Sequence, residues 1–219
     1  MTADLFDDLP PSEEEGLQRL IAPGAVLLRG FAREDDAVLL RAINDVIALA
    51  PLRHLCTPGG YTMSVAMSNC GQLGWLSDTR GYRYAALDPL SGRPWPAMPA
   101  CCRDLALRAA AQAGFGPFQP DACLINVYEP GAKLSLHQDK DEKDFSAPIV
   151  SLSLGLPAVF LFGTQRRSER PQRLRLSHGD VVVWGGSARL AYHGVAPLAD
   201  GEHALLGRRR INLTFRRAV

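Results

Sequence analysis

A series of short apolar segments, running from about residue 118 to the C-terminus, limits the fold more than any other feature. Each segment has the length of a strand, and Gly, Pro or Asp residues separate it from the next. Apolar residues at helical spacing precede this region at 34–50 and at about 98–113, and Pro51 and Gly114 end the two stretches. We therefore predict an α+β, mainly β fold: a jelly roll, or double-stranded β-helix, supported by N-terminal helices.

The chain divides by composition into a short tail and one domain. Residues 1–16 are acidic and contain no basic residue, so we predict a flexible tail followed by a single domain over 17–219. Within that domain, 118–217 is the predicted jelly-roll core. The segment 51–96 is rich in Gly, Tyr, Ser and Pro, and we expect it to cover a site.

Finer assignments follow from local patterns. GAVLLRGF (24–31) and YTMSVAM (61–67) have the composition of strands, whereas GYRYAALDPLSGRPWPAMP (81–99) has that of loops. DACLINVYEPG alternates, so that Cys123, Ile125 and Val127 face one way and Leu124, Asn126 and Tyr128 face the other.

Composition also limits where in the cell the protein is expected and which class of partner it can bind. The sequence has no run of eighteen apolar residues and no signal-peptide pattern, so we expect neither a membrane span nor secretion. Five cysteines without a C-x-x-C pair favour a reducing cytoplasm. The net charge is −6 over 1–50 and +7 over 165–219. The basic C-terminal third suits a nucleic-acid partner, although an ordinary solvated basic face explains it equally well.

One tripeptide has the composition of a metal site. In a strand, residues i and i+2 share a face, so His137 and Asp139 can bind the same ion, with His193 as a third ligand from a later strand. Two imidazoles and a carboxylate form the ligand set of non-haem iron(II) oxygenases, although a zinc hydrolase can use the same three groups. His178-Gly179-Asp180 has the same spacing, but it reads better as the turn before the strand VVVWGG. His54 and His203 have no such partner carboxylate, and we expect ordinary packing or surface roles.

The last apolar segment adds a polar face. In RRRINLTFRR, alternation places Ile211, Leu213 and Phe215 on one side, and the other side carries Arg210, Asn212, Thr214 and Arg216. If that polar side faces the interior, its guanidinium groups need an anion, and a dicarboxylate matches the fork of an arginine. Salt bridges on an exposed edge strand are the alternative.

Four long segments, read together, carry a family pattern: LINVYEPGAKLSLHQDKDE, IVSLSLGLPAVFLFG, HGDVVVWGGSARLAYHG and RRINLTFR. TPGGYTMSVAMSNCGQLGW and RPWPAMP extend it upstream, so that it covers roughly 20–217. In this order they resemble the AlkB family of nucleic-acid dealkylation dioxygenases, which use iron(II), 2-oxoglutarate and O2. The resemblance implies that His137, Asp139 and His193 bind iron(II). It also implies that 2-oxoglutarate contacts Asn126, Tyr128, Arg210, Asn212 and Arg216.

For the substrate, the resemblance implies a base-binding site under a nucleotide-recognition lid, made of Trp75, Tyr82, Tyr84, Asp141 and Arg167. A flipped base would stack between Trp75 and His137. The implied reaction is oxidative demethylation of 1-methyladenine and 3-methylcytosine in single-stranded or double-stranded DNA, and possibly RNA, with release of formaldehyde, succinate and CO2. We expect a monomer. The alternatives are a related dioxygenase that acts mainly on RNA or protein, and a jelly-roll binding module without catalysis.

Overall fold

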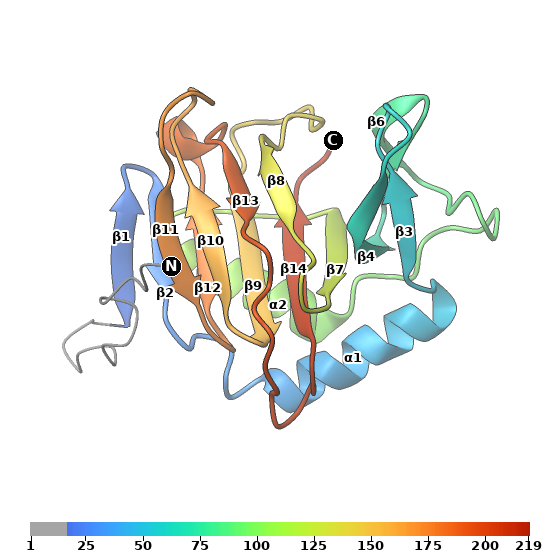
Figure 1. Cartoon of the computed structure of the whole chain (residues 1–219), viewed down its shortest axis with the longest axis horizontal. Helices are drawn as coiled ribbons and strands as arrows, with labels where there is room; N and C mark the ends of the chain where they lie inside the picture. The colour runs from blue at the N-terminus through green and yellow to red at the C-terminus, as the bar shows by residue number, and fades with distance from the viewer. Residues whose placement is uncertain (1–16) are drawn as a thin grey trace, which may run out of the picture.

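The structure, a computed structural model, describes residues 17–219, so the predicted tail 1–16 lies outside the described residues. Two antiparallel sheets lie face to face, and a two-stranded hairpin stands beside them (Figure 1). The large sheet has the order β1 (Gln18–Ala22), β2 (Ala25–Leu28), β12 (Val181–Trp184), β9 (Ile149–Gly155), β14 (Arg210–Arg216), β7 (Ala122–Tyr128), β4 (Thr62–Gly71) and β3 (Arg53–Cys56). The small sheet has the order β11 (Gln172–Leu176), β10 (Ala158–Phe162), β13 (His193–Val195) and β8 (Leu134–His137). The hairpin consists of β5 (Gly74–Asp78) and β6 (Gly81–Ala85).

The large sheet separates two apolar clusters. On one face, alternate residues of β7 and β14, such as Ile125 and Leu213, pack against helices α1 (Asp36–Leu49) and α2 (Ala100–Gln112). On the other face, the sheet packs against the small sheet around Phe160 and Trp184. The predicted jelly roll with supporting helices is therefore confirmed, and both helices lie within two residues of the predicted bounds.

The position of the central strand β14 is explained by the strict alternation of its apolar and polar residues. It pairs with β7 over seven residues and with β9 on its other side, and Ile211, Leu213 and Phe215 turn toward the helices. The opposite side chains, Arg210, Asn212, Thr214 and Arg216, line a cavity between the sheets. Of the two alternatives for this polar side, the interior one is therefore correct, and the exposed edge strand is not.

The region before residue 100 contains more strand than predicted. The assignment of 81–99 to loops was wrong at its start, because Gly81–Ala85 forms β6 and pairs with β5 across the two-residue turn Thr79-Arg80. Gly81 adopts φ +111°, a conformation that favours glycine, and the Asp78 carboxylate accepts hydrogen bonds from Arg80 and Arg83. Strand β1 was not predicted, because its mostly exposed residues show no alternation.

Two further strands of the predicted cover extend the large sheet. Strand β4 pairs with β7 from Ala66 to Gly71, and β3 pairs with β4 at the sheet edge. In the part of the chain that the structure describes, neither helix is long and apolar enough to cross a lipid bilayer.

Candidate active site

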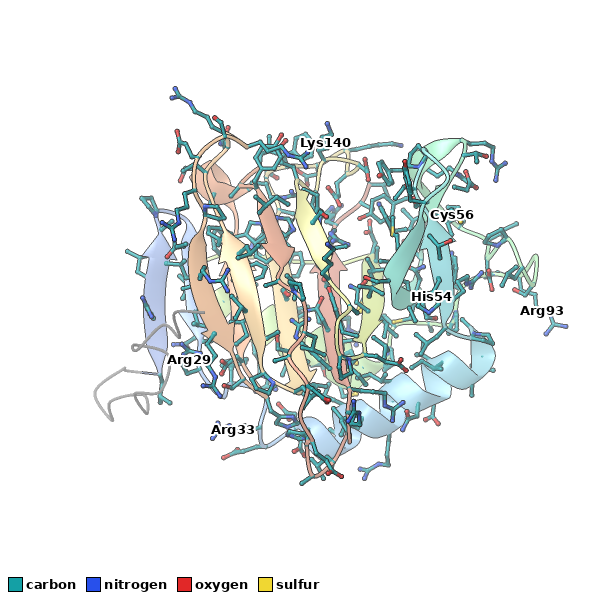
Figure 2. The ribbon with its side chains drawn as sticks, viewed as in Figure 1. Arg29, Arg33, His54, Cys56, Arg93 and Lys140 are labelled. Atoms are coloured by element: carbon teal, nitrogen blue, oxygen red, sulfur yellow. The ribbon has the colours of Figure 1, made fainter. Side chains whose placement is uncertain are left out.

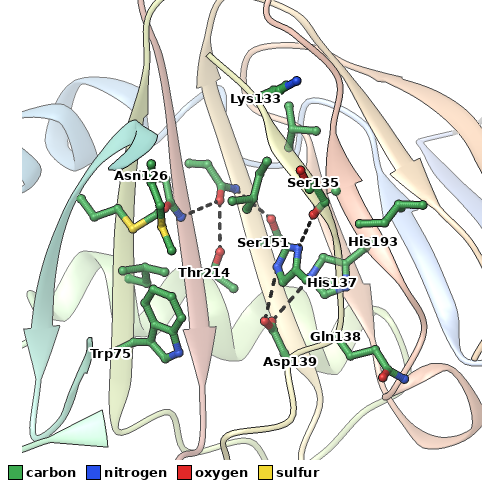
Figure 3. Close-up of a pocket in the computed structure, with 18 of the residues that line it drawn as sticks. Trp75, Asn126, Lys133, Ser135, His137, Gln138, Asp139, Ser151, His193 and Thr214 are labelled. Atoms are coloured by element: carbon green, nitrogen blue, oxygen red, sulfur yellow. Dashed lines mark hydrogen bonds and ion pairs between the residues drawn. The ribbon is translucent and has the colours of Figure 1, made fainter. Parts of the chain in front are cut away.

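The three predicted metal ligands converge at one end of the small sheet. His137 ends β8, His193 begins β13, and the two are directly paired across the strands. Asp139 lies two residues beyond β8, so it reaches the site from a loop and not from the strand face that we predicted. Its carboxylate oxygens lie 3.7 Å from the Nε2 atoms of both histidines (Figure 3), and one donor atom from each residue lies within 4.8 Å of the others. This spacing suits a single ion.

The backbone fixes which nitrogen of each imidazole faces the site. His137 Nδ1 donates to the carbonyl of Ser135 at 2.8 Å, and His193 Nδ1 donates to the carbonyl of Ala191 at 3.0 Å. The Nε2 lone pairs therefore point toward Asp139, as metal ligation requires. Burial, together with the neighbouring His137, lowers the pKa of His193 to about 4, so this ring is neutral at pH 7.

The Asp139 carboxylate is held in its charged form. Burial raises its pKa, but Arg216 and the two histidines outweigh burial and bring the pKa well below its usual range. Arg216 donates from Nε and Nη2 to one Asp139 oxygen at 2.8 and 2.7 Å. Two imidazoles and one carboxylate, open toward a cavity, fit iron(II).

The floor of the cavity contains a buried cation without a carboxylate partner. Arg210 is 1% exposed, and among residues 17–219 its Nε and Nη1 have no hydrogen-bond partner. Its guanidinium lies 4.9 Å from the ring centre of Tyr128, and Nη2 donates to Ser153 Oγ at 2.9 Å. A buried guanidinium with unpartnered donors needs an anion, and a carboxylate of 2-oxoglutarate is an anion whose oxygens match guanidinium donors.

The two asparagines behind this cation have different environments. Asn212 donates to Ser151 Oγ and to the carbonyl of Leu152, both at 2.8 Å, and its carbonyl accepts from Thr214. Asn126 donates to Asn212 at 3.4 Å, while its own side-chain oxygen has no hydrogen-bond partner among residues 17–219. The polar side chains therefore form one connected network along the cavity floor, and Asn126 is the less completely bonded of the two.

Four of the five predicted base-binding residues line the same cavity of about 680 Å³: Trp75, Tyr82, Asp141 and Arg167. The rings of Trp75 and Tyr82 stack with centres 5.6 Å apart, and the Trp75 indole donates to Asp141 at 2.8 Å. Tyr84 does not line this cavity. Its hydroxyl donates to Glu142 at 2.6 Å, and burial raises the pKa of Tyr84 far above its usual value.

The second tripeptide with metal-site spacing, His178-Gly179-Asp180, has a structural role. The Asp180 carboxylate accepts from the backbone N–H groups of Ser177 and Gly30, which closes the predicted turn. His178 Nδ1 accepts from the Gly155 N–H, and its Nε2 donates to Asp36 at 3.2 Å.

The remaining two histidines also lie away from the metal ligands. His203 stacks on the His178 ring with centres 4.6 Å apart. His54 lies on β3 (Figure 2), and its Nδ1 donates to the carbonyl of Met63.

Two buried charged residues beside the site were not predicted. Glu142 stands among the charges of DKDEKD, which suggest a solvated loop, and Arg189 stands alone in GGSARLAY. In the structure both are buried, and Arg189 donates to Glu142 at 3.1 Å. Local sequence offers no signal for either, because their partners lie 47 residues apart in the chain.

Comparison with known proteins agrees with this geometry. The model of the 2OG-Fe(II) oxygenase superfamily matches residues 24–216. The chain is 58% identical to the alpha-ketoglutarate-dependent dioxygenase AlkB of Escherichia coli, over 98% of this chain and 97% of that one. It is 33% identical to the DNA N(6)-methyladenine demethylase ALKBH1C of Arabidopsis thaliana, over 90% of this chain and 49% of that one.

A solved structure of OsALKBH1 superposes with a TM-score of 0.80 at 30% identity, over 91% of this chain and 99% of that one. The chain therefore belongs to the AlkB dioxygenases of the 2OG-Fe(II) oxygenase superfamily, and it uses iron(II), 2-oxoglutarate and O2.

Proposed function

We propose that this dioxygenase repairs alkylated DNA by oxidative demethylation of 1-methyladenine and 3-methylcytosine. The observation that carries the proposal is that a stacked aromatic pair and a carboxylate share one cavity with the metal ligands: Trp75, Tyr82 and Asp141. The E. coli relative is an alpha-ketoglutarate-dependent dioxygenase, and the Arabidopsis relative acts on methylated adenine in DNA. The second name agrees with a methylated base as the substrate.

The chain supplies binding and orientation. Bound iron(II), with 2-oxoglutarate and O2, supplies the oxidation of the N-methyl group to a hydroxymethyl group that leaves as formaldehyde, while succinate and CO2 are formed. His137, Asp139 and His193 hold the metal at the end of β8 and β13. Arg210 would bind one carboxylate of the co-substrate, and Arg216, which donates to Asp139, would lie near the other.

The cavity favours a cationic base. Both proposed lesions carry a positive charge at neutral pH, and the faces of aromatic rings and the carboxylate of Asp141 attract a cation. Trp75 and His137 both line the cavity and lie on different sides of it (Figure 3), so a flipped base would lie between the indole and the imidazole. An undamaged base lacks the charge, and its extrusion from the duplex costs more than that of a lesion that already pairs badly.

The basic loop between β10 and β11 provides contacts for the nucleic-acid backbone. Arg167 reaches the cavity, where its guanidinium lies 5.9 Å from the ring centre of Tyr192. Arg166 and Arg170 are exposed on the same loop. Lys140 lies at the end of the molecule opposite Arg33 (Figure 2), and it lines the same cavity. These positive charges suit phosphates on either side of a flipped nucleotide.

The choice between DNA and RNA, and the assembly state, belong to the same proposal. Backbone phosphates are common to both nucleic acids, so competition between methylated single-stranded DNA, RNA and peptide decides the substrate class. We propose a monomer that works in the cytoplasm, where a reducing environment keeps the five free cysteines as thiols.

A demethylation assay tests the function. Wild-type protein with iron(II), 2-oxoglutarate and O2 should release formaldehyde from single-stranded oligonucleotides that contain 1-methyladenine or 3-methylcytosine, and His137→Ala should release none. Retained iron-dependent formaldehyde release by His137→Ala would refute the ligand assignment. If wild-type protein consumes 2-oxoglutarate but no methylated nucleic acid competes as a substrate, the proposed substrate class is wrong.

A further inference from the structure

The metal ligand Asp139 lies in a segment with little regular structure. Residues 138–148 connect β8 to β9 without forming a helix or strand. This segment carries three acidic side chains that face the interior or the cavity: Asp139, Asp141 and Glu142. Strand pairing does not fix this segment, and its main chain is joined to the C-terminal residues by a hydrogen bond from Lys143 to the carbonyl of Ala218. Side chains from elsewhere are therefore needed to hold Asp139 in place.

Arg189 binds this segment at three points. Its Nη1 donates to the main-chain carbonyl of Asp139 at 2.8 Å, its Nε donates to the carbonyl of Ala147 at 3.1 Å, and its Nη2 donates to Glu142 at 3.1 Å. The guanidinium also lies 5.3 Å from the ring centre of Phe145. Arg189 is buried, and all of these partners belong to one loop, so a single planar fork spans the loop from its beginning to its end.

Glu142 joins Arg189 to the rest of the site. One carboxylate oxygen accepts from Arg189, while the other accepts from the Tyr84 hydroxyl at 2.6 Å and lies 3.4 Å from Arg216 Nε. Arg216 in turn binds Asp139. Two arginines and two carboxylates thus form a buried network without net charge, which leaves Asp139 anchored through both its side chain and its backbone.

The same loop is tied to the hairpin β5–β6. Trp75 and Tyr84 are direct cross-strand partners in that hairpin. Trp75 donates to Asp141, and Tyr84 donates to Glu142, at 2.8 and 2.6 Å. Two cross-strand aromatic residues therefore donate hydrogen bonds to two consecutive carboxylates, which lie two and three residues after the metal ligand Asp139.

We propose that Arg189 and Glu142 are positioning residues that hold Asp139 in the orientation needed to bind the metal. We also propose that Tyr84 connects the loop of Asp139 to the base-binding hairpin. The inference deepens the proposed function, since it rests on Asp139 as a metal ligand. It also assigns Tyr84 to the support of the loop and the hairpin and not to contact with the base.

Metal affinity of the whole protein, measured with Co(II) by its visible absorption in the absence of 2-oxoglutarate, tests the positioning role. Glu142→Gln leaves the two arginines with one excess positive charge beside the site, and Arg189→Lys keeps the charge but loses the fork that spans the loop. Loss of a group that supports a metal ligand weakens metal binding by about 10- to 100-fold, and we expect this loss for both variants. The urea midpoint of each variant shows whether it is folded.

Tyr84→Phe separates the two parts of the proposal. Removing only the hydroxyl should leave Co(II) affinity within about threefold of wild type, while KM for a methylated oligonucleotide rises about tenfold and kcat changes less, since the loss of one hydrogen bond to a charged group is worth about 1.5 kcal/mol or more. An unchanged KM would show that the hairpin does not depend on this link.

Arg208→Lys and Asp200→Asn provide the matched controls, because they alter an ion pair of the same chemistry, 2.9 Å long, that is exposed. Both should bind Co(II) as wild type does. If wild-type protein binds no Co(II), the proposed function fails. If it binds while folded Glu142→Gln and Arg189→Lys bind equally tightly, the positioning role is wrong. Should Arg189→Lys not fold, Glu142→Gln alone decides.

Discussion

Replacing Arg210 with Met should weaken co-substrate binding without weakening the fold. The guanidinium is buried, has two unpartnered donors and has no carboxylate beside it among residues 17–219. In the absence of ligand it therefore carries a desolvation cost that nothing offsets fully. Burial itself lowers its pKa. Met fills a similar volume and leaves no charge behind, so the ligand-free variant should be as stable as wild type, or more stable.

The loss in affinity follows from the hydrogen bonds that the guanidinium would donate to a carboxylate. A hydrogen bond to a charged group contributes about 1.5–3 kcal/mol, so two such bonds to a carboxylate contribute about 3 kcal/mol at the lower bound. That loss corresponds to roughly 150-fold weaker binding. At a 2-oxoglutarate concentration of 100 times the wild-type Kd, bound ligand stabilises wild type by about 2.7 kcal/mol, whereas the variant should gain only about 0.3 kcal/mol.

Urea unfolding at a fixed concentration of redox-inactive Mn(II), with and without 2-oxoglutarate, measures both effects. Arg208→Met serves as the control, since Arg208 is exposed and pairs with Asp200 at the surface. Two results would contradict the reasoning: an equal gain from 2-oxoglutarate in Arg210→Met and wild type, or a loss of more than about 3 kcal/mol in the ligand-free variant, which would mark Arg210 as a structural residue.

Three further predictions concern two buried thiols, a histidine away from the metal ligands, and Trp75. Burial raises the pKa of the Cys102 and Cys123 thiols, so iodoacetamide at neutral pH should label neither in the folded protein and both in urea; rapid labelling of the native protein, seen by peptide mass spectrometry, would contradict this. Burial, with the His178 ring, lowers the pKa of His203, so the stability gained from its neutral form is complete above pH of about 6.5 and is lost as the pH falls further. His203→Gln should make the urea midpoint less dependent on pH between 7 and 5, and an unchanged dependence would exclude His203 as the cause. Trp75→Ala should raise KM for a methylated oligonucleotide about tenfold or more, the value of one lost stacking contact, with Co(II) affinity unchanged; an unchanged KM would remove Trp75 from the base site.

The parts of the fold that the sequence predicted depend on alternation in buried strands. Strands β7 and β14 each place one face against the helices and the other in the cavity, and both patterns are visible in seven consecutive residues. Alternation predicted that Arg210 and Arg216 share one side of the last strand, because an apolar side chain stands at every other position between them, but it left open whether that side is buried or exposed.

The parts that were missed depend on partners far away in the chain or on turns. Tyr82 and Tyr84 alternate in β6, but Gly, Pro and Asp residues downstream gave the whole segment the composition of a loop. Glu142 and Arg189 resemble surface charges, and only the folded chain brings them to each other and to Arg216. A pattern of period two also places Asp139 on a strand that ends two residues earlier.

Because His137 and His193 are paired across β8 and β13, a metal bound to both would also hold these two strands of the small sheet together. Strand β8 is an edge of that sheet, and its pairing with β13 is irregular beyond the two histidines. An ion bound there closes a loop of 56 residues and joins the edge strand to the loop of Asp139, much as a covalent cross-link does. We therefore expect the loss of iron to loosen this edge of the small sheet. Amide hydrogen exchange in β8 should follow metal occupancy, and a cell short of iron would hold a protein with an unpaired strand edge open to association.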